Sequence, residues 1–200
     1  MDIKNVKSAC YLLCLLTLLT GLLYPLVITG LAQLIFPWQA NGSLININGK
    51  IVGSQWIGQS FTSTAFFHGR PSATLPFPYN AKNSAGSNIA LTNPAYLINL
   101  TNSINQLRQL NPDTKQPVPI DMITSSASGL DPDITPSAAF YQMARIAKAR
   151  NISIDVLTNL INQHTMKPTA GFIGEQRVNV LALNIALLSL SKPHASLSGQ

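Results

Sequence analysis

The stretch that decides the fold is ACYLLCLLTLLTGLLYPLVITGLAQLIF, residues 9–36, in which no side chain carries a charge. A helix over this stretch reaches roughly 40 Å at 1.5 Å per residue, which is enough to cross a hydrocarbon core of about 30 Å. A cleaved signal peptide is the alternative, but its apolar region has only about 7–15 residues before a small-residue cleavage site. The sequence therefore predicts an uncleaved transmembrane helix over Ala9–Phe36.

The charges that flank this helix predict its orientation. Lys4 and Lys7 precede it, and the first charged residue beyond it is Lys50. The positive-inside rule then places residues 1–8 in the cytoplasm and residues 37–200 outside. Cys10 and Cys14 lie in the helix, where we interpret them as packing residues. The exterior part thus has no thiol that can mispair in an oxidising compartment, in agreement with export.

One face of the helix carries residues that favour close helix packing. Thr17, Gly21, Pro25 and Thr29 recur every four residues and form a narrow stripe that the backbone of another helix can approach. The alternative is that these residue types are simply common in membrane helices and that Pro25 introduces a bend. The stripe suggests a partner within the membrane.

The composition excludes several classes of function. The chain has 200 residues, 46% hydrophobic and 10% charged, with a net charge of +6. Its basic residues are scattered, and the densest group, Arg145, Lys148 and Arg150, fits the solvated face of one helix better than a nucleic-acid surface. Seven carboxylates and three histidines leave few arrangements for acid–base or metal chemistry.

The exterior part begins with strands and loops. Asn48-Gly49 separates Leu44–Ile47 from Lys50–Val52 and is typical of a two-residue hairpin turn, because both positions tolerate positive φ. Ile57–Phe61 is a candidate for a further strand. The later segments rich in glycine, serine and proline predict ordered loops.

The second half has the spacing of helices. Asn93-Pro94 starts one that runs to about Leu110, Thr135-Pro136 starts another, and Ser153 starts a short third. The last strong helix should contain Val178, Leu181, Ile185 and Leu188. With no internal repeat, residues 37–200 are expected to form one α+β domain behind the single transmembrane helix.

Three groups of residues suggest chemistry, and each has a simpler structural interpretation. Ser126 or Ser128 with His68 and Asp131 contains the ingredients of a hydrolase, but the sequence lacks a Gly-x-Ser-x-Gly elbow. Asp131 and Asp133, with Asp121 upstream, suggest a cation site, although an acidic loop before a helix is the preferred interpretation.

The third group is the segment Gly53-Ser54-x-x-Ile57-Gly58-Gln59, which we interpret as a turn and strand because it lacks the ending of a phosphate-binding loop. Glu175 and Arg177 are expected at a helix start, where the carboxylate stabilises the first turn. The histidines are far apart, so no zinc site is predicted, and no metal or cofactor of the chain's own is expected.

Read in order, these segments closely resemble the C subunit of the bacterial Kdp potassium-transporting ATPase. The matching blocks are Tyr24–Leu26 through Thr29-Gly30, Gln39–Ser43, Gly53–Phe61, Phe67–Ala73, Ser84–Asn88, Ser128–Pro132, Ala139–Arg150 and Gly171–Leu183. No single block is specific, but their number and order span nearly the whole chain.

This resemblance implies an accessory, non-hydrolysing subunit of an ATP-driven potassium importer in the bacterial inner membrane. Its implied partners are a channel-like potassium-binding subunit, a P-type ATPase subunit and a small membrane peptide, with ATP and potassium acting at the level of the complex. Such subunits are described as catalytic chaperones that raise ATP affinity, with a glutamine near the Gly-Ser-x-x-Ile-Gly-Gln segment proposed to contact nucleotide. Gln55 and Gln59 occupy these positions here.

The predicted topology places Gln59 outside, away from cytoplasmic ATP, so a scaffold role or a role in potassium access is physically easier. Phe67, His68, Arg70 and Asp131 are the residues expected at a partner interface. The alternatives are a membrane-anchored hydrolase and a stand-alone envelope binding module.

Overall fold

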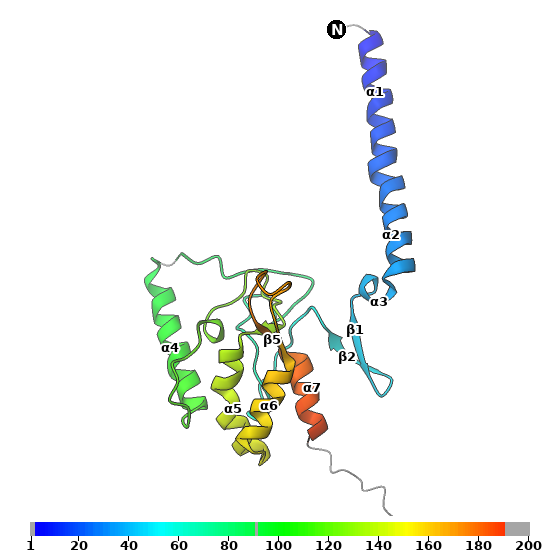
Figure 1. The fold of residues 1–200 in the computed structure, drawn as a ribbon. Coiled ribbons are helices and arrows are strands. Elements are labelled where there is room, and N and C mark those ends of the chain that lie inside the picture. Colours follow the sequence, from blue (N-terminus) through cyan, green and yellow to red (C-terminus); the bar gives the residue numbers. More distant parts are fainter. Residues whose placement is uncertain (1–2, 91, 191–200) are drawn as a thin grey trace, which may run out of the picture. The chain divides into compact units, whose positions relative to one another are not determined.

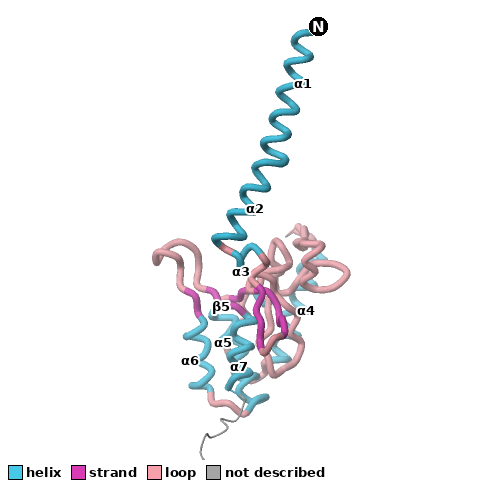
Figure 2. The backbone as a smooth tube through the Cα atoms, turned by 90° about the vertical axis from the view of Figure 1, so that its right-hand side faces the viewer, coloured by secondary structure: helices cyan, strands magenta, loops and turns pink. Residues whose placement is uncertain are grey.

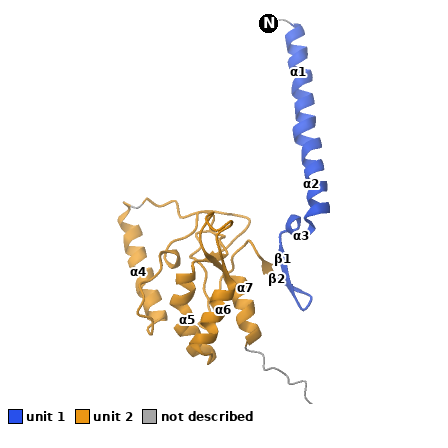
Figure 3. Cartoon of the chain, in the orientation of Figure 1, with its two compact units in different colours: residues 1–52 blue, residues 53–200 orange. Residues whose placement is uncertain are grey.

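The chain forms two compact units in a computed structural model that describes residues 3–90 and 92–190. The first unit covers residues 1–52 and the second covers residues 53–200 (Figure 3). Together they give the mixed fold that the sequence predicts, one long apolar helix followed by an α+β domain. Each unit is described separately below.

The first unit is dominated by one helix, Ile3–Ile35, that is long and apolar enough to cross a membrane (Figure 1). It consists of α1 (Ile3–Leu18), a π-helical turn (Leu19–Leu23) and α2 (Tyr24–Ile35). The helix begins before the predicted Ala9 because Lys4 and Lys7 are compatible with helical backbone even though they end the apolar run. None of its described residues is buried within the chain.

The π turn lies directly before Pro25, the residue at which the sequence suggested a bend. Proline has no N–H to donate to the carbonyl four residues earlier, so the regular hydrogen-bond ladder is interrupted there. The N–H of Tyr24 instead donates to the carbonyl of Leu19, five residues back, as in a π-helix. The proline therefore coincides with a local change of helical pitch.

A short helix and the predicted hairpin complete this unit. α3 (Pro37–Ala40) leads to β1 (Leu44–Ile47) and β2 (Lys50–Ser54), which pair in a two-stranded sheet. Asn48 and Gly49 have φ values of 53° and 80°, which confirms the turn prediction. The indole N–H of Trp38 donates to the Leu44 carbonyl at 2.9 Å and joins α3 to the hairpin.

The second unit is built on three helices and a small sheet. α5 (Pro136–Arg150), α6 (Ile154–His164) and α7 (Val180–Leu190) lie side by side, and the antiparallel sheet lies at one end of them (Figures 1 and 2). The strand order is β3 (Asp133–Ile134), β5 (Arg177–Asn179), β4 (Thr165–Met166). In the register, Ile134 and Thr165 both lie opposite Val178.

The helix starts are those that the sequence predicts. The side chains of Asn93, Thr135 and Ser153 accept hydrogen bonds from the N–H groups of Ala95, Ala138 and Val156, respectively. Each satisfies a backbone donor that the first helical turn leaves without an intrahelical acceptor. α4 (Pro94–Leu110) ends where predicted, but none of its described residues is buried.

Two predictions of secondary structure are wrong. The predicted strand Ile57–Phe61 does not form: Ile57 makes only an isolated bridge with Ser54, and the N–H of Gly58 donates to the distant Leu130 carbonyl instead of joining a ladder. Val178 lies in β5, not in the last helix, which begins only at Val180. Buried short strands and buried helices have the same apolar composition, so periodicity does not separate them here.

The same shift corrects the prediction for Glu175 and Arg177. Glu175 precedes β5 and Arg177 is its first residue. The N-terminal turn of α7 is capped by Asn179, whose side-chain oxygen Oδ1 accepts from the N–H of Ala182 at 3.0 Å. Glu175 is therefore not a first-turn carboxylate.

The core of the second unit lies between these helices and the segment that follows β2. It consists of fully or nearly fully buried side chains: Phe67, Met122, Ile134, Ala138, Ala139, Ile146, Leu157, Leu160, Ile161, Val178, Val180, Leu183 and Leu187. Phe67 comes from an irregular segment of the chain, so its backbone must find hydrogen-bond partners outside a sheet.

Two buried side-chain amides provide those partners. Asn184 of α7 accepts from the N–H of Phe67 and donates to its carbonyl, both at 2.9 Å. Gln142 of α5 does the same for His68, at 2.8 and 3.0 Å. Each amide occupies the place that the peptide group of a neighbouring strand takes in a sheet.

Two arginines of α5 hold the residues just before Phe67. The guanidinium of Arg145 donates to the carbonyls of Thr64 and Phe66 and to the side chains of Asn111 and Gln142. Burial lowers the pKa of Arg145 to about 10. The Arg150 guanidinium lies 4.6 Å from the centre of the Phe66 ring, a cation–π contact. The sequence predicted that Arg145, Lys148 and Arg150 form a solvated helix face. In the structure, Arg145 and Arg150 instead contact the residues before Phe67.

The paired amides give a test of the fold. Asn184→Ala leaves the buried N–H and carbonyl of Phe67 without partners, at about 1–3 kcal/mol for each group. We expect the free energy of unfolding to fall by about 2–4 kcal/mol, measured by urea unfolding of the full-length chain in detergent with near-ultraviolet circular dichroism. The control Asn102→Ala, on the exposed part of α4, should change it by less than about 0.5 kcal/mol. Equal stability of the two variants would contradict the role of Asn184.

Candidate functional site

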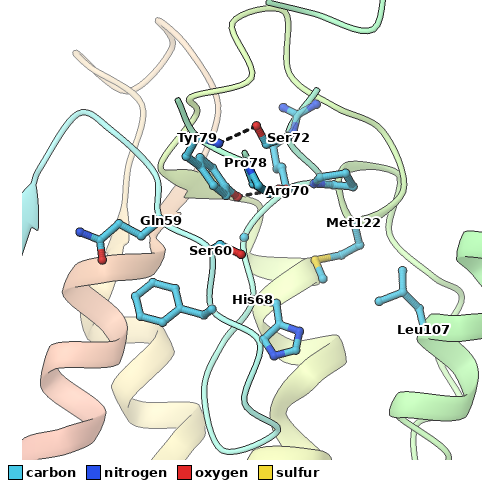
Figure 4. Close-up of a pocket in the computed structure, with 12 residues that line it drawn as sticks. Gln59, Ser60, His68, Arg70, Ser72, Pro78, Tyr79, Leu107 and Met122 are labelled. Carbon is cyan, nitrogen blue, oxygen red and sulfur yellow. Dashed lines mark hydrogen bonds between the residues drawn. The ribbon is translucent and has the colours of Figure 1, made fainter. Parts of the chain in front are cut away.

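The candidate residues of the second unit gather around the segment that leaves β2. Gln59, His68 and Arg70 line a pocket of about 270 Å³, which Tyr79 and Met122 also line (Figure 4). Phe67 is fully buried and belongs to the core, so its surface is not presented to a partner. His68, Arg70 and Asp131 are partly exposed, so a partner can reach them. Their role at an interface stays a prediction.

Tyr79 fixes one wall of this pocket. Its hydroxyl donates to the Arg70 carbonyl at 2.6 Å, and its N–H donates to the Ser72 hydroxyl at 2.9 Å (Figure 4). Burial raises the pKa of Tyr79 to about 12, so the hydroxyl keeps its proton and remains a donor at neutral pH. A side chain on Gly69 would place its Cβ 2.6 Å from this hydroxyl, which explains glycine there.

The glycines of the Gly-Ser-x-x-Ile-Gly-Gln segment also have packing reasons. A Cβ on Gly58 would lie 2.4 Å from the Tyr79 ring and 2.7 Å from the Asp131 carbonyl. A Cβ on Gly53 would lie 2.1 Å from Nε2 of Gln59 and 2.8 Å from Leu181. The small residues thus let the chain pass close to its own neighbours, which supports a structural interpretation of this segment over a phosphate cradle.

The two glutamines in this segment lie in different surroundings. Gln59 covers Gly53 and lines the pocket, whereas the Gln55 carbonyl accepts from the side-chain amide of Asn179 at 3.0 Å. Both are only partly exposed. A nucleotide contact by either side chain stays a prediction.

Arg70 and Asp131 form an ion pair that joins two loops. One nitrogen of the Arg70 guanidinium lies 3.2 Å from Oδ2 of Asp131, and both side chains are about one-quarter to one-third exposed, at 25% and 30%. Oδ1 of Asp131 accepts from the N–H of Asp133 at 3.0 Å. Because the pair is partly solvated, its value lies more in positioning the loops than in stability.

Hydroxyl groups connect the same loops. The Ser72 hydroxyl donates to the Gly129 carbonyl at 2.7 Å, and the Ser84 hydroxyl donates to the Ser128 carbonyl at 2.9 Å. The blocks around residues 67–73, 84–88 and 128–132, which are separate in the sequence, are therefore one connected region.

The groups proposed for a hydrolase do not assemble as a triad. Nε2 of His68 lies 2.9 Å from the Ser63 carbonyl, and burial lowers the pKa of the imidazole. The hydroxyls of Ser126 and Ser128 accept from the N–H groups of Gly129 and Leu130. The serines therefore stabilise their own turn, as their position beside Gly129 predicts.

The three aspartates of the proposed cation site take part in different contacts. Oδ2 of Asp121 accepts from the N–H of Thr135 at 2.8 Å, directly before α5, and Asp133 pairs with Arg177 at 3.0 Å. Burial raises the pKa of Asp133, and the hydrogen bond from Asn179 partly offsets this effect. Within residues 3–90 and 92–190, no three acidic, histidine or cysteine side chains converge closely enough to ligate a metal ion.

The stripe on the long helix has no partner within its own unit. Thr17, Gly21, Pro25 and Thr29 are all exposed. A Cβ on Gly21 would meet only the Thr17 methyl group, at 3.9 Å, so nothing in the described part of the chain requires glycine there.

Gln142, Asn184 and Tyr79, whose side chains organise the region, do not stand out as functional residues in the sequence. A local signal exists for the first two, because each is an amide in the middle of an apolar helix face, where an unpaired polar group is costly. Their partners lie 74 and 117 residues away, so the pattern shows that they need partners but not which ones.

Comparison with known proteins shows which family the chain belongs to. Residues 6–189 match the family described as KdpC, the c chain of K⁺-transporting ATPase. A relative from Polaromonas naphthalenivorans is 51% identical over 193 residues, which is 96% of this chain and 98% of the relative. A relative from Methylococcus capsulatus is 50% identical over 188 residues, 94% of this chain and 99% of the relative.

Both relatives are named potassium-transporting ATPase KdpC subunits. The match begins at the start of the long helix and ends in α7, so it includes both units. The chain therefore belongs to the KdpC family.

Proposed function

We propose that this chain is an accessory, non-hydrolysing subunit of an ATP-driven potassium importer in the bacterial plasma membrane. The observation that carries the proposal is the family match over residues 6–189, supported by relatives of near-equal length at about half identity. Its partners are a channel-like potassium-binding subunit, a P-type ATPase subunit and a small membrane peptide. ATP and potassium then act at sites of the complex.

The chain crosses the membrane once, with its N-terminus in the cytoplasm and its domain outside. The helix Ile3–Ile35 has 33 residues, about 50 Å at 1.5 Å each, which exceeds a hydrocarbon core of about 30 Å. Lys4 and Lys7 lie in the first two turns of this helix, before its apolar run, and Lys50 is the first positive residue after the helix. This asymmetry supports the orientation.

The membrane helix contributes an assembly surface along the Thr17–Thr29 stripe. Glycine within a helix costs roughly 0.5–1 kcal/mol relative to alanine, and the contacts of Gly21 within the chain do not offset that cost. Close approach of a partner helix does, because small residues let two backbones meet in a membrane. The π turn before Pro25 shapes this surface.

An effect on ATP affinity, if exerted by this chain, acts through assembly and not through direct contact with nucleotide. The tightly packed glycines around Gln59 and the exterior placement of this segment both support an indirect effect. Gln55 and Gln59 then contribute to the packing of the domain. The domain supports its partners by a rigid surface around Arg70 and Asp131.

The topology is tested by labelling an introduced cysteine. In a chain with Cys10→Ala and Cys14→Ala, no native thiol remains. Ser60→Cys, at an exposed position next to Gln59, should react with a membrane-impermeant maleimide added outside, and Asn5→Cys should react only after the cytoplasmic side is opened. The reverse pattern would place the domain in the cytoplasm and make direct contact with ATP possible again.

The assembly surface is tested by Gly21→Leu in cells that lack the native copy. Leucine fills the space into which a partner helix packs, so we expect recovery of the other subunits with the tagged chain to fall about fivefold or more, equivalent to about 1 kcal/mol. Growth at limiting potassium should weaken in parallel, and cells without any copy should not grow.

Gly30→Leu is the matched control, because Gly30 is a second glycine of the membrane helix and lies outside the stripe. A Cβ added there has nothing within 4 Å. It should assemble normally. Normal potassium uptake in cells without the chain would refute the proposed function, whereas equal assembly of the two leucine variants would refute only the assembly surface.

A further inference from the structure

The connection between β4 and β5 presents two adjacent large apolar side chains to solvent. Phe172 is 79% exposed and Ile173 is 58% exposed, and Phe172 is the most exposed large apolar side chain described in the second unit. The connection extends beyond the small sheet (Figure 2). We call residues 168–174 the apolar turn. Its two apolar side chains take no part in the core, so the folding of the domain does not explain them.

The backbone of the apolar turn has a defined conformation. The N–H of Thr169 donates to the Ile173 carbonyl at 2.9 Å, and the N–H of Ile173 donates back to the Thr169 carbonyl at 3.0 Å. Gly171 and Gly174 have φ values of 84° and 90°, and a Cβ added to either would have nothing within 4 Å. These glycines therefore serve the bend of the backbone and not a close approach to a neighbour. The turn holds its apolar pair outward.

The turn also satisfies most of its own backbone donors. Of the six residues from Pro168 to Ile173, five have a backbone N–H, because proline has none, and four of these donate within the turn: Thr169, Gly171, Phe172 and Ile173. Water-exposed backbone does not need such bonds, whereas a backbone group that enters lipid without a partner is costly. A loop that docks on a protein by strand pairing instead offers free backbone groups. The pattern therefore favours lipid as the neighbour of the turn.

The distribution of charge around the turn agrees with a lipid neighbour. None of residues 168–174 carries a charge, and the nearest charged residues, Lys167 and Glu175, are both exposed. Charged side chains are disfavoured in hydrocarbon but tolerated at the level of the headgroups. An uncharged tip between charged flanking residues fits the boundary between the two.

The membrane helix of the same chain explains how so small a surface can bind. Even one myristoyl chain binds a bilayer only marginally, so two apolar side chains do not hold a free protein on a membrane. The helix Ile3–Ile35, however, is long and apolar enough to anchor the chain. Anchoring makes the second contact intramolecular, and a weak contact is then populated.

We propose that the apolar turn inserts Phe172 and Ile173 into the interfacial region of the bilayer in which the chain is anchored. The turn is then a second, peripheral membrane contact, made by the domain itself. This inference rests on the membrane anchor of the proposed function, but it does not depend on the partner subunits.

The test uses the full-length chain with a single tryptophan. Trp38→Phe and Trp56→Phe remove both native tryptophans, and Phe172→Trp introduces one at the tip. The chain is reconstituted alone in vesicles of phosphatidylcholine and phosphatidylglycerol, with or without bromine on the acyl chains, because bromine quenches tryptophan only at close range. We expect the brominated lipids to reduce the emission by about half, as for a side chain buried at the headgroup boundary.

Val156→Trp in the same background is the matched control. Val156 is also an exposed apolar residue, at 42%, but it lies in the first turn of α6, whereas β4 and the apolar turn follow the other end of that helix. Its emission should be the same in both lipids. Adding Ile173→Asp to the Phe172→Trp chain should abolish the quenching, because a carboxylate is disfavoured in hydrocarbon. Since Ile173 is exposed, the unfolding temperature should stay unchanged.

Equal emission of the Phe172→Trp chain in the two lipids would overturn the proposal, as would equal quenching at positions 156 and 172 or quenching that Ile173→Asp leaves unchanged. A change of emission that requires the other subunits would also overturn it and would assign the turn to a protein partner. An alkaline carbonate wash of the vesicles tests the anchor separately. A chain that is washed off contradicts the proposed topology, whereas a chain that stays bound but is not quenched contradicts only this inference.

Discussion

The domain depends on satisfying the backbone of an irregular segment where it enters the core at Phe67 and His68. The described residues between β2 and α4 form no named helix or strand, yet Phe67 is fully buried in the core. Asn184 and Gln142 solve the problem by presenting one acceptor and one donor each to consecutive residues. The segment therefore acquires its conformation only when α5 and α7 are in place, and local order here follows from long-range packing.

This dependence explains which parts of the fold could be predicted from the sequence. The starts of α4, α5 and α6 depend on caps that act within three residues, and the hairpin turn depends on two adjacent residues with positive φ. Such features are visible in any short window of sequence. The strands β3, β4 and β5 have two or three residues each and pair across the domain, so no local periodicity identifies them.

The candidate site likewise combines features that a short stretch of sequence shows with contacts that only the folded chain makes. The blocks that contain Arg70, Ser84 and Asp131 stood out individually, but only the folded chain joins them, through an ion pair that spans 61 residues and a serine that reaches across 44. The segment with Gly53 and Gly58 is interpreted from sequence as a turn and strand, in preference to a phosphate-binding loop. In the structure these glycines mark places where the backbone passes a tyrosine ring, a carbonyl or a helix side chain. The spacing of the glycines in the sequence indicates that small residues are needed there, but it does not show which groups lie close to them.

The aspartates before α5 show how the fold uses its few acidic residues. Asp131 and Asp133 have their structural roles accounted for by Arg70, Arg177, Asn179 and the backbone of the loop. Asp121 accepts its hydrogen bond from the N–H of Thr135, the N-cap of α5. A negative charge is favourable there because the positive end of the helix dipole faces it. In a chain with so few carboxylates, each of these three therefore fixes a loop or a helix start, and the helix that follows in the sequence explains the acidic residues before it.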